Sequence, residues 1–393
     1  TITSGIPSDH YTRAIRSDKT REGLLYAGTE WGLYISFDDG MSWKPFQLNL
    51  PITSIRDLHV RDNDLIAATH GRSFWMIDDL TPLHQLSTEL NQKKFHLYKP
   101  DKAYRMQQSG VSRRTNYKLF GKNHPNGAIL NYYIKEVNAE DEISIEIKEK
   151  DGTLIQRFSN TAKTNKLNPE ADIPLKVNPG ANRLIWNLRY PGFKAFEGMV
   201  FYSSPNVGPK AVPGGYRITL NYNGAVIEQP LEVLKDPRLS NTKEDYEAQF
   251  DFLIQVRDEV SKANSAIIEI RQVQKDLDYL KQKKNLSNEL QDYISQFEKE
   301  LSLVENKIHM TKNQSRQDPL NYGIRINNRI AFLLADSQRG DYPPTDQSKA
   351  FFREVSAELK KVLGELEKVL KEKIKTLNQM LSSSQIEMIS SKS

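Results

Sequence analysis

The sequence of 393 residues contains no cysteine. Disulfide bridges, thiolate zinc sites and a cysteine nucleophile are therefore excluded. No apolar run approaches the ~20 residues that a membrane-spanning helix needs. The motifs G-x-S-x-G, H-E-x-x-H and the P-loop lysine motif are also absent. We therefore expect no transmembrane segment, no metal site and no cofactor, and we assign no catalytic residue.

Neither sign of charge dominates the chain. It has 55 Lys and Arg residues against 50 Asp and Glu residues, which gives a formal net charge of +5. The basic residues form no stripe with interleaved aromatic side chains, which is the pattern of a nucleic-acid-binding surface. Nucleic acid is therefore not an expected partner. The length is sufficient for two or three domains.

Residues 1–90 contain short strand patterns separated by Gly, Asp and Asn turns. The segment 24–29 (LLYAGT) is similar to the segment 64–69 (DLIAAT), at a spacing of about 40 residues. This spacing is typical of a four-stranded β-propeller blade. We therefore predict that residues 1–90 form two blades of an incomplete propeller. Two blades without a ring would leave apolar faces and strand edges uncovered.

A polar turn of the form S-x-D-x-G-x-S-W connects two of these strands. Its defining residues are Ser36, Asp38, Gly40, Ser42 and Trp43. Asp38 can accept backbone N–H groups of its own turn, Gly40 permits a positive φ, and Trp43 can pack under the hairpin. We predict a structural role for this turn, because it lacks the further spaced oxygens that a calcium loop needs.

The remaining chain divides into three parts. Residues 91–115 read as a polar connector with basic pairs at 93–94 and 113–114. Residues 116–235 contain many short strand patterns between turn signals, which is typical of an immunoglobulin-like or fibronectin III-like β-sandwich with Trp186 as its core aromatic. In residues 236–393, apolar residues recur every three or four positions and predict an antiparallel helical bundle.

Two details of the helical part can be predicted as well. Four helices are expected, the third of them beginning near Pro319. The serine-rich end after Leu381 is expected to be frayed. The predicted fold class is therefore a multidomain β plus α protein.

The polar turn fully matches the Asp-box of BNR-repeat propellers, a class that includes sialidases and sortilin-type propellers. The segments 26–36 and 69–80 resemble the end of the propeller in large bacterial sortilin-like proteins, which are often labelled glycosyl hydrolases. Other segments similar to that family are 213–218 (PGGYRI), 235–238 (KDPR), 318–322 (DPLNY) and 340–345 (GDYPPT).

The resemblance implies the last propeller blades, then a sandwich, then a helical tail. It also implies an extracytoplasmic location, in the periplasm, at the outer-membrane surface or secreted. Further blades are expected upstream, and the chain begins with Thr1 and has no signal-peptide pattern. We therefore expect a processed or truncated fragment of a longer precursor.

His70, Arg72, Asp78 and Asp79 are the candidate binding residues. A histidine, an arginine and carboxylates near a propeller channel could bind a carboxylate or a sugar. The alternative is structural: Arg72 forms ion pairs with Asp78 or Asp79 that tie the ring together.

Two functions remain open from the sequence. The first is a non-catalytic extracytoplasmic binding or assembly protein. Its partners would be an upstream propeller segment of the same precursor or a companion chain, and also other proteins or a membrane-associated complex. The alternative is a glycoside or other hydrolase whose active site lies mainly on upstream blades. Common glycosidases need two carboxylates at a set separation, and the sequence does not indicate which of its carboxylates face each other. The hydrolase label rests on analogy of fold, which does not establish function.

Overall fold

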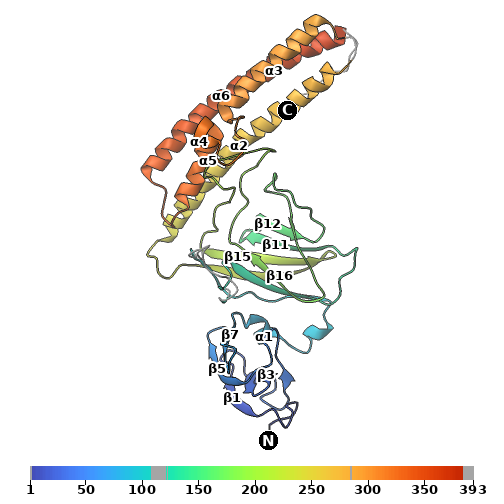
Figure 1. The fold of residues 1–393 in the computed structure, drawn as a ribbon, viewed down its shortest axis with the longest axis vertical. Coiled ribbons are helices and arrows are strands. Elements are labelled where there is room, and N and C mark those ends of the chain that lie inside the picture. Colours follow the sequence, from blue (N-terminus) through green and yellow to red (C-terminus); the bar gives the residue numbers. More distant parts are fainter. Residues whose placement is uncertain (1, 108–120, 122, 284–285, 384–393) are drawn as a thin grey trace.

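The computed structural model describes residues 2–107, 121, 123–283 and 286–383. Three regions follow one another along its long axis: two small β-sheets at the N-terminal end, a larger β-region in the middle and a helical region at the C-terminal end (Figure 1). The predicted mixture of β-structure followed by a C-terminal helical region is confirmed.

The N-terminal region consists of two antiparallel sheets. The first has four strands in sequence order: β1 (Thr12–Ser17), β2 (Leu25–Thr29), β3 (Gly32–Ser36) and β4 (Lys44–Pro45). The second has three: β5 (Ile55–Arg61), β6 (Asp64–Thr69) and β7 (Phe74–Ile77). The sheets share one core, in which Tyr26 and Ile35 of the first sheet cluster with Leu58 and Leu65 of the second.

The two sequence segments that resemble each other occupy equivalent places, since β2 and β6 are each the second strand of a sheet. The second sheet has no counterpart of β4 among the described residues. After β7 the chain enters the short helix α1 (Thr81–Gln85), which has a proline in its first turn. The Asp79 carboxylate accepts the Thr81 N–H at 3.0 Å.

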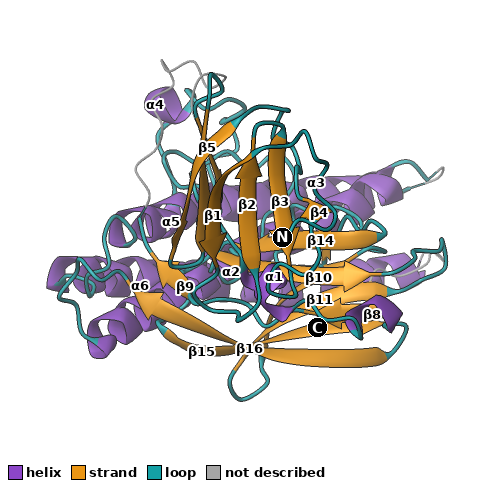
Figure 2. Cartoon of the chain, turned by 90° about the horizontal axis from the view of Figure 1, so that it is seen from below, coloured by secondary structure: helices purple, strands orange, loops and turns teal. Residues whose placement is uncertain are grey.

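The central β-region (residues 95–235) contains two sheets around one core. The smaller sheet has the order β14 (Gly180–Trp186), β10 (Ala128–Ile134), β8 (Phe95–Leu97). The larger has the order β13 (Ile173–Pro174), β12 (Leu154–Ser159), β11 (Ile143–Glu149), β15 (Gly214–Tyr222), β16 (Ala225–Lys235), β9 (Ala103–Arg105). Figure 2 shows β15 and β16 side by side along the lower edge of the picture. Trp186, the predicted core aromatic, is 1% exposed in this core, as expected.

The segment predicted as a polar connector differs from the prediction. It contributes two of the strands above, because β8 pairs with β10 and β9 pairs with β16. Leu97 and Ala103 point into the core of the central β-region. Residues 108–115 of the predicted connector lie outside the described residues.

Within residues 236–283 and 286–383, the helical region contains two long helices and three shorter ones. They are α2 (Lys243–Lys281), α3 (Asn288–Ile308), α4 (Pro319–Tyr322), α5 (Ile326–Ser337) and α6 (Asp346–Ser383). A capping box starts α2, in which Thr242 and Asp245 exchange side chain-to-backbone hydrogen bonds. The predicted third helix is two separate helices, because Gly323 follows α4 with a φ of +77°, which ends a helix. The predicted frayed end falls mainly on residues 384–393, which lie outside the described residues, and α6 continues to Ser383.

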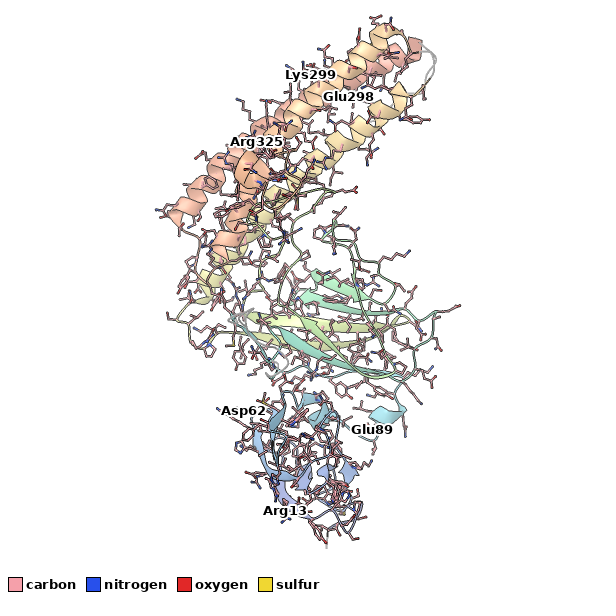
Figure 3. The ribbon with its side chains drawn as sticks, viewed as in Figure 1. Arg13, Asp62, Glu89, Glu298, Lys299 and Arg325 are labelled. Atoms are coloured by element: carbon pink, nitrogen blue, oxygen red, sulfur yellow. The ribbon has the colours of Figure 1, made fainter. Side chains whose placement is uncertain are left out.

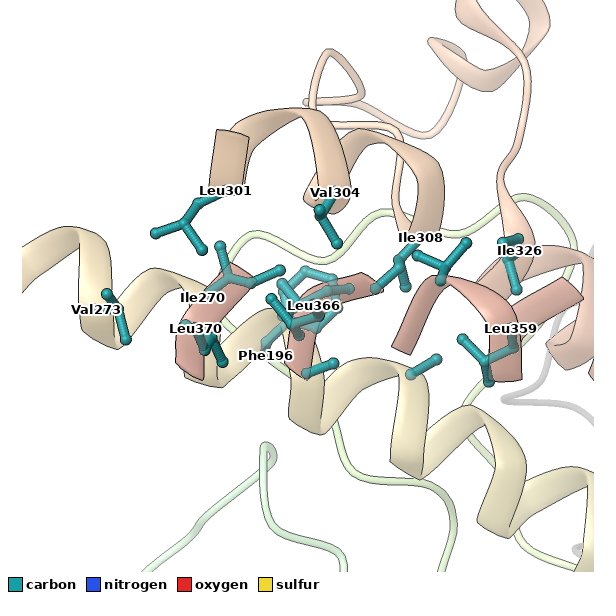
Figure 4. Close-up of a cluster of buried hydrophobic side chains, with 14 of the residues drawn as sticks. Phe196, Ile270, Val273, Leu301, Val304, Ile308, Ile326, Leu359, Leu366 and Leu370 are labelled. Atoms are coloured by element: carbon teal, nitrogen blue, oxygen red, sulfur yellow. The ribbon is translucent and has the colours of Figure 1, made fainter. Parts of the chain in front are cut away.

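Side chains of the central β-region enter the core of the helices. Phe193 and Phe196, on the loop after β14, are at most 4% exposed in one cluster with Ile270 of α2 and Leu366 of α6. Figure 4 shows Phe196 between these helices. The amide of Asn264 in α2 donates to the Lys194 carbonyl of the same loop at 2.6 Å. The loop therefore anchors the central β-region to the helices.

In the part of the chain that the structure describes, none of the helices has both the length and the apolar content that crossing a membrane requires.

Candidate functional site

The Asp-box turn satisfies its own polar groups. The Asp38 carboxylate accepts the Ser42 N–H at 2.9 Å, the Ser36 hydroxyl at 2.7 Å and the Ser42 hydroxyl. These hydrogen bonds, that from the Ser42 hydroxyl first, lower the pKa of Asp38 to about 2. Gly40 has a φ of +83°, and Trp43 is 4% exposed. The hydrogen bonds of Asp38 therefore stay within its own turn.

Replacing Asp38 with alanine should therefore loosen the β3–β4 connection. The change removes the acceptor for one N–H and two hydroxyl groups. We expect faster amide hydrogen exchange across residues 36–43, measured by mass spectrometry, with a smaller change in Asp38→Asn because the amide oxygen can still accept. Unchanged exchange in Asp38→Ala would contradict a role in holding the turn.

The four candidate binding residues do not form one cluster. His70 and Arg72 are exposed in the loop between β6 and β7, where the Arg56 guanidinium lies 2.8 Å from the His70 Nδ1. Asp78 and Asp79 follow the other end of β7. A strand of four residues is about 13 Å long. The predicted site is therefore two separate pairs.

Asp78 and Asp79 pair with an arginine of the central β-region rather than with Arg72. Arg183 of β14 lies 3.7 Å from each carboxylate. Asp79 is 7% exposed and also accepts the side-chain amide of Asn131 in β10 at 2.6 Å. These contacts join the N-terminal sheets to the central β-region. No local pattern points to Arg183, because the pairing depends on how two distant regions dock.

An acidic cavity of about 570 Å³ lies at this junction. Its carboxylates come from the β5–β6 turn, the start of β6, the end of β7 and the segment before β9. The charged and titratable lining residues are Asp62, Asp64, Asp78, Asp79, Asp101, Lys102, His124 and Arg238. Asp62 lies at the end of the N-terminal sheets nearest the central β-region, whereas Arg13 lies at the far end (Figure 3).

Burial, followed by the charge of Asp78, raises the pKa of Asp64. Carboxylates in this arrangement accept hydrogen bonds and attract positively charged groups. Among the residues that the structure describes, no group of three or more His, Asp and Glu side chains could hold a metal ion. Asp62, Asp64 and Asp101 were not singled out from the sequence. There Asp62 belongs to a hairpin turn, Asp64 begins the strand segment 64–69 and Asp101 belongs to the predicted connector.

No family model matches the chain, and no curated protein matches it. Similar solved structures include two of the extracellular domain of BT4673 from B. thetaiotaomicron, described as a one component system and as a hybrid two component system. Both are 11% identical, with TM-scores of 0.16 and 0.17, and cover 59% and 60% of this chain. A third, named pT26-6p, is 12% identical with a TM-score of 0.14 and covers 88% of this chain and 68% of its own.

The chain spans 26% and 27% of the two BT4673 chains. TM-scores this low transfer neither a fold nor a function to the chain. The similarity to sortilin-like BNR propellers therefore stays a prediction from the sequence.

Proposed function

We propose that this chain is part of a non-catalytic extracytoplasmic binding or assembly protein, and that its two N-terminal sheets are the last blades of a BNR propeller. The observation that supports this proposal is the uncovered outer face of the β5–β6–β7 sheet. Its inner face packs on the first sheet through Leu58, Leu65 and Ala67. Its outer face carries apolar side chains with no described element packed over them.

The pairing of β6 with β7 defines this outer face. Met76 lies opposite Ile66, and Phe74 lies opposite Ala68. Residues directly opposite each other in an antiparallel pair project to the same side. Phe74 is 77% exposed and Met76 is 54% exposed. A cluster of exposed large apolar side chains on one sheet face marks an interaction surface.

The first sheet indicates what such a surface binds. There, β4 pairs along the outer edge of β3. Trp43 and Tyr34 on the far face are covered by the N-terminal segment through Ile6. In the second sheet, β7 is an edge strand in the described part of the chain. We infer that an upstream propeller segment, from the same precursor or a companion chain, supplies the missing strand and covers the apolar face.

The test mixes this chain with the purified segment that precedes it in its precursor and measures the dissociation constant by calorimetry. The double substitution Phe74→Ser with Met76→Ser should weaken the complex by at least about 100-fold, because burying each side chain contributes roughly 1.5–3 kcal/mol. Val226→Ser is the control, because Val226 is 56% exposed on a strand of a different sheet. Equal binding by the double variant would overturn the proposal, and no binding by the unmodified chain would exclude a segment of the same precursor as the partner.

The hydrolase alternative makes a different prediction. A non-catalytic protein should turn over no glycoside or peptide as the full precursor. Turnover that a single carboxylate substitution abolishes, for example Asp78→Asn, would favour the hydrolase and contradict our proposal. Asp78 lines the acidic cavity, so this substitution also tests whether the cavity takes part in any turnover.

A further inference from the structure

Both N-terminal sheets have the same irregularity at the same place. In the first sheet, the pairing of β1 with β2 shifts next to Thr29, which leaves Arg13 as an extra residue. In the second sheet, the pairing of β5 with β6 shifts next to Thr69, and Arg56 is the extra residue. A β-bulge of this kind re-aims the side chain that it inserts. The repeat therefore places one arginine at the same end of each sheet, the end where Figure 3 labels Arg13.

The residue that follows each threonine contacts the bulge arginine of its own sheet. In the first sheet this residue is Glu30, whose carboxylate pairs with the Arg13 guanidinium. In the second sheet it is His70, whose Nδ1 lies 2.8 Å from the Arg56 guanidinium. Glu30 also contacts the bulge arginine of the following sheet, because Arg56 lies 3.4 Å from its carboxylate. One acidic side chain is thus held between two arginines, one from each sheet.

His70 stands in the second sheet where Glu30 stands in the first, but no further sheet follows it in the N-terminal region that the structure describes. Arginine cannot accept a hydrogen bond, so the His70 Nδ1 accepts from Arg56. In the neutral ring the other nitrogen, Nε2, then carries the proton and donates. His70 and Arg72 are exposed, and Arg56 has a side chain that is 46% exposed. This end of the second sheet therefore presents hydrogen-bond donors and positive charge.

We propose that the segment covering the second sheet places a carboxylate against His70 and Arg56, at the bulge position of its own first strand. This inference rests on the propeller function proposed above and names the chemistry of one contact within it. A third bulge arginine at that position would face Arg56 and Arg72 without a counter-charge. An aspartate or glutamate instead accepts from the His70 Nε2 and offsets the positive charge. The partner is thus an upstream blade of the same precursor with an acidic bulge residue.

The first test measures how tightly the chain binds the purified segment that precedes it in its precursor, by calorimetry. His70→Glu sets two carboxylates against each other and should weaken the complex at least about tenfold. His70→Gln keeps a donor and an acceptor and should bind within about threefold of the unmodified chain. Lys243→Glu is the control for net charge, because Lys243 is 67% exposed at the start of α2, and it should bind like the unmodified chain. Circular dichroism establishes that each variant is folded.

A cross-linking measurement locates the carboxylate itself. His70→Lys puts an amine at this position, and a zero-length carbodiimide reagent joins an amine to a carboxylate in contact with it. Mass spectrometry of the complex should find position 70 joined to an Asp or Glu of the preceding segment. Val226→Lys is the matched control, because Val226 is 56% exposed on a strand of a different sheet, and it should give no such product.

The outcomes separate this contact from the function on which it rests. The segment could bind, and depend on Phe74 and Met76, while His70→Glu binds it equally well. The blade would then dock without the carboxylate, and this inference alone would be overturned. A complex in which position 70 cross-links only within its own chain would overturn it as well. If the segment does not bind the unmodified chain, both this contact and a partner from the same precursor are excluded.

Discussion

Replacing Arg105 with methionine should lower the free energy of unfolding by about 3–5 kcal/mol, because it leaves a buried carboxylate without its partner. Arg105 of β9 is 2% exposed and lies between the central β-region and the helices. Its guanidinium donates to Asp341 at 3.0 and 3.2 Å, to the Ala211 carbonyl at 3.0 Å and to Gln249 of α2. It also lies 4.8 Å from the ring centre of Tyr246.

Chemical denaturation followed by circular dichroism measures this effect. The double variant Arg105→Met with Asp341→Leu should recover part of the loss, because it contains no uncompensated charge. Lys243→Ala is the matched control for an ion pair at the surface, where Lys243 and Glu247 are 67% and 47% exposed, and should change stability by less than about 1 kcal/mol. If Arg105→Met lowered the free energy of unfolding by less than about 1 kcal/mol, the buried pair would contribute little to stability.

Lowering the pH from 7 to 4 should destabilise the helical region through His309. This residue is 2% exposed at the end of α3, with its ring 4.9 Å from the ring of Phe196. Burial, assisted by the positive charge of Arg271, lowers the pKa of His309 from 6.5 to about 4. The unfolded chain therefore takes up this proton at a higher pH than the folded chain does.

Because the unfolded chain binds this proton more readily than the folded chain, acid lowers the free energy of unfolding. The stabilisation by neutral His309 is complete above pH 6.5 and is lost as the pH falls toward 4, by about 3 kcal/mol in all. The measurement is the denaturation midpoint at several pH values for the unmodified chain and for His309→Gln. Other titrating groups act on both proteins, so the difference between the two curves isolates His309. Parallel curves would mean that His309 does not cause the loss.

Local patterns in the sequence predicted much of the secondary structure. The bounds of β6 agree with the expected segment 64–69, and those of β2 agree with the segment 24–29 to within one residue, because turns delimit both. The three- and four-residue spacing of apolar residues predicted α2 over nearly its full length. By contrast, β8 and β9 have three residues each and exist because of strands far along the chain, β10 and β16. Segments that short carry no periodicity from which a strand can be recognised.

The candidate site was harder to predict for the same reason. Asp78 and Asp79 were singled out as candidate binding residues, and the structural alternative paired them with Arg72. Arg183 takes that place because two separate regions pack together. Arg105 is the extreme case: it stands in a segment predicted to be a polar connector and is among the most buried charged residues described. Pairing between regions depends on tertiary contacts, which local patterns do not contain.

The loop that carries Phe193 and Phe196 into the helical core has a mechanical consequence. Because these side chains pack among the helices, the central β-region and the helices should move as one rigid body. With 39 residues, α2 is roughly 58 Å long. A force applied at the far tip of the helices would therefore exert a torque on the β-region. Any bending should concentrate at the junction with the N-terminal sheets.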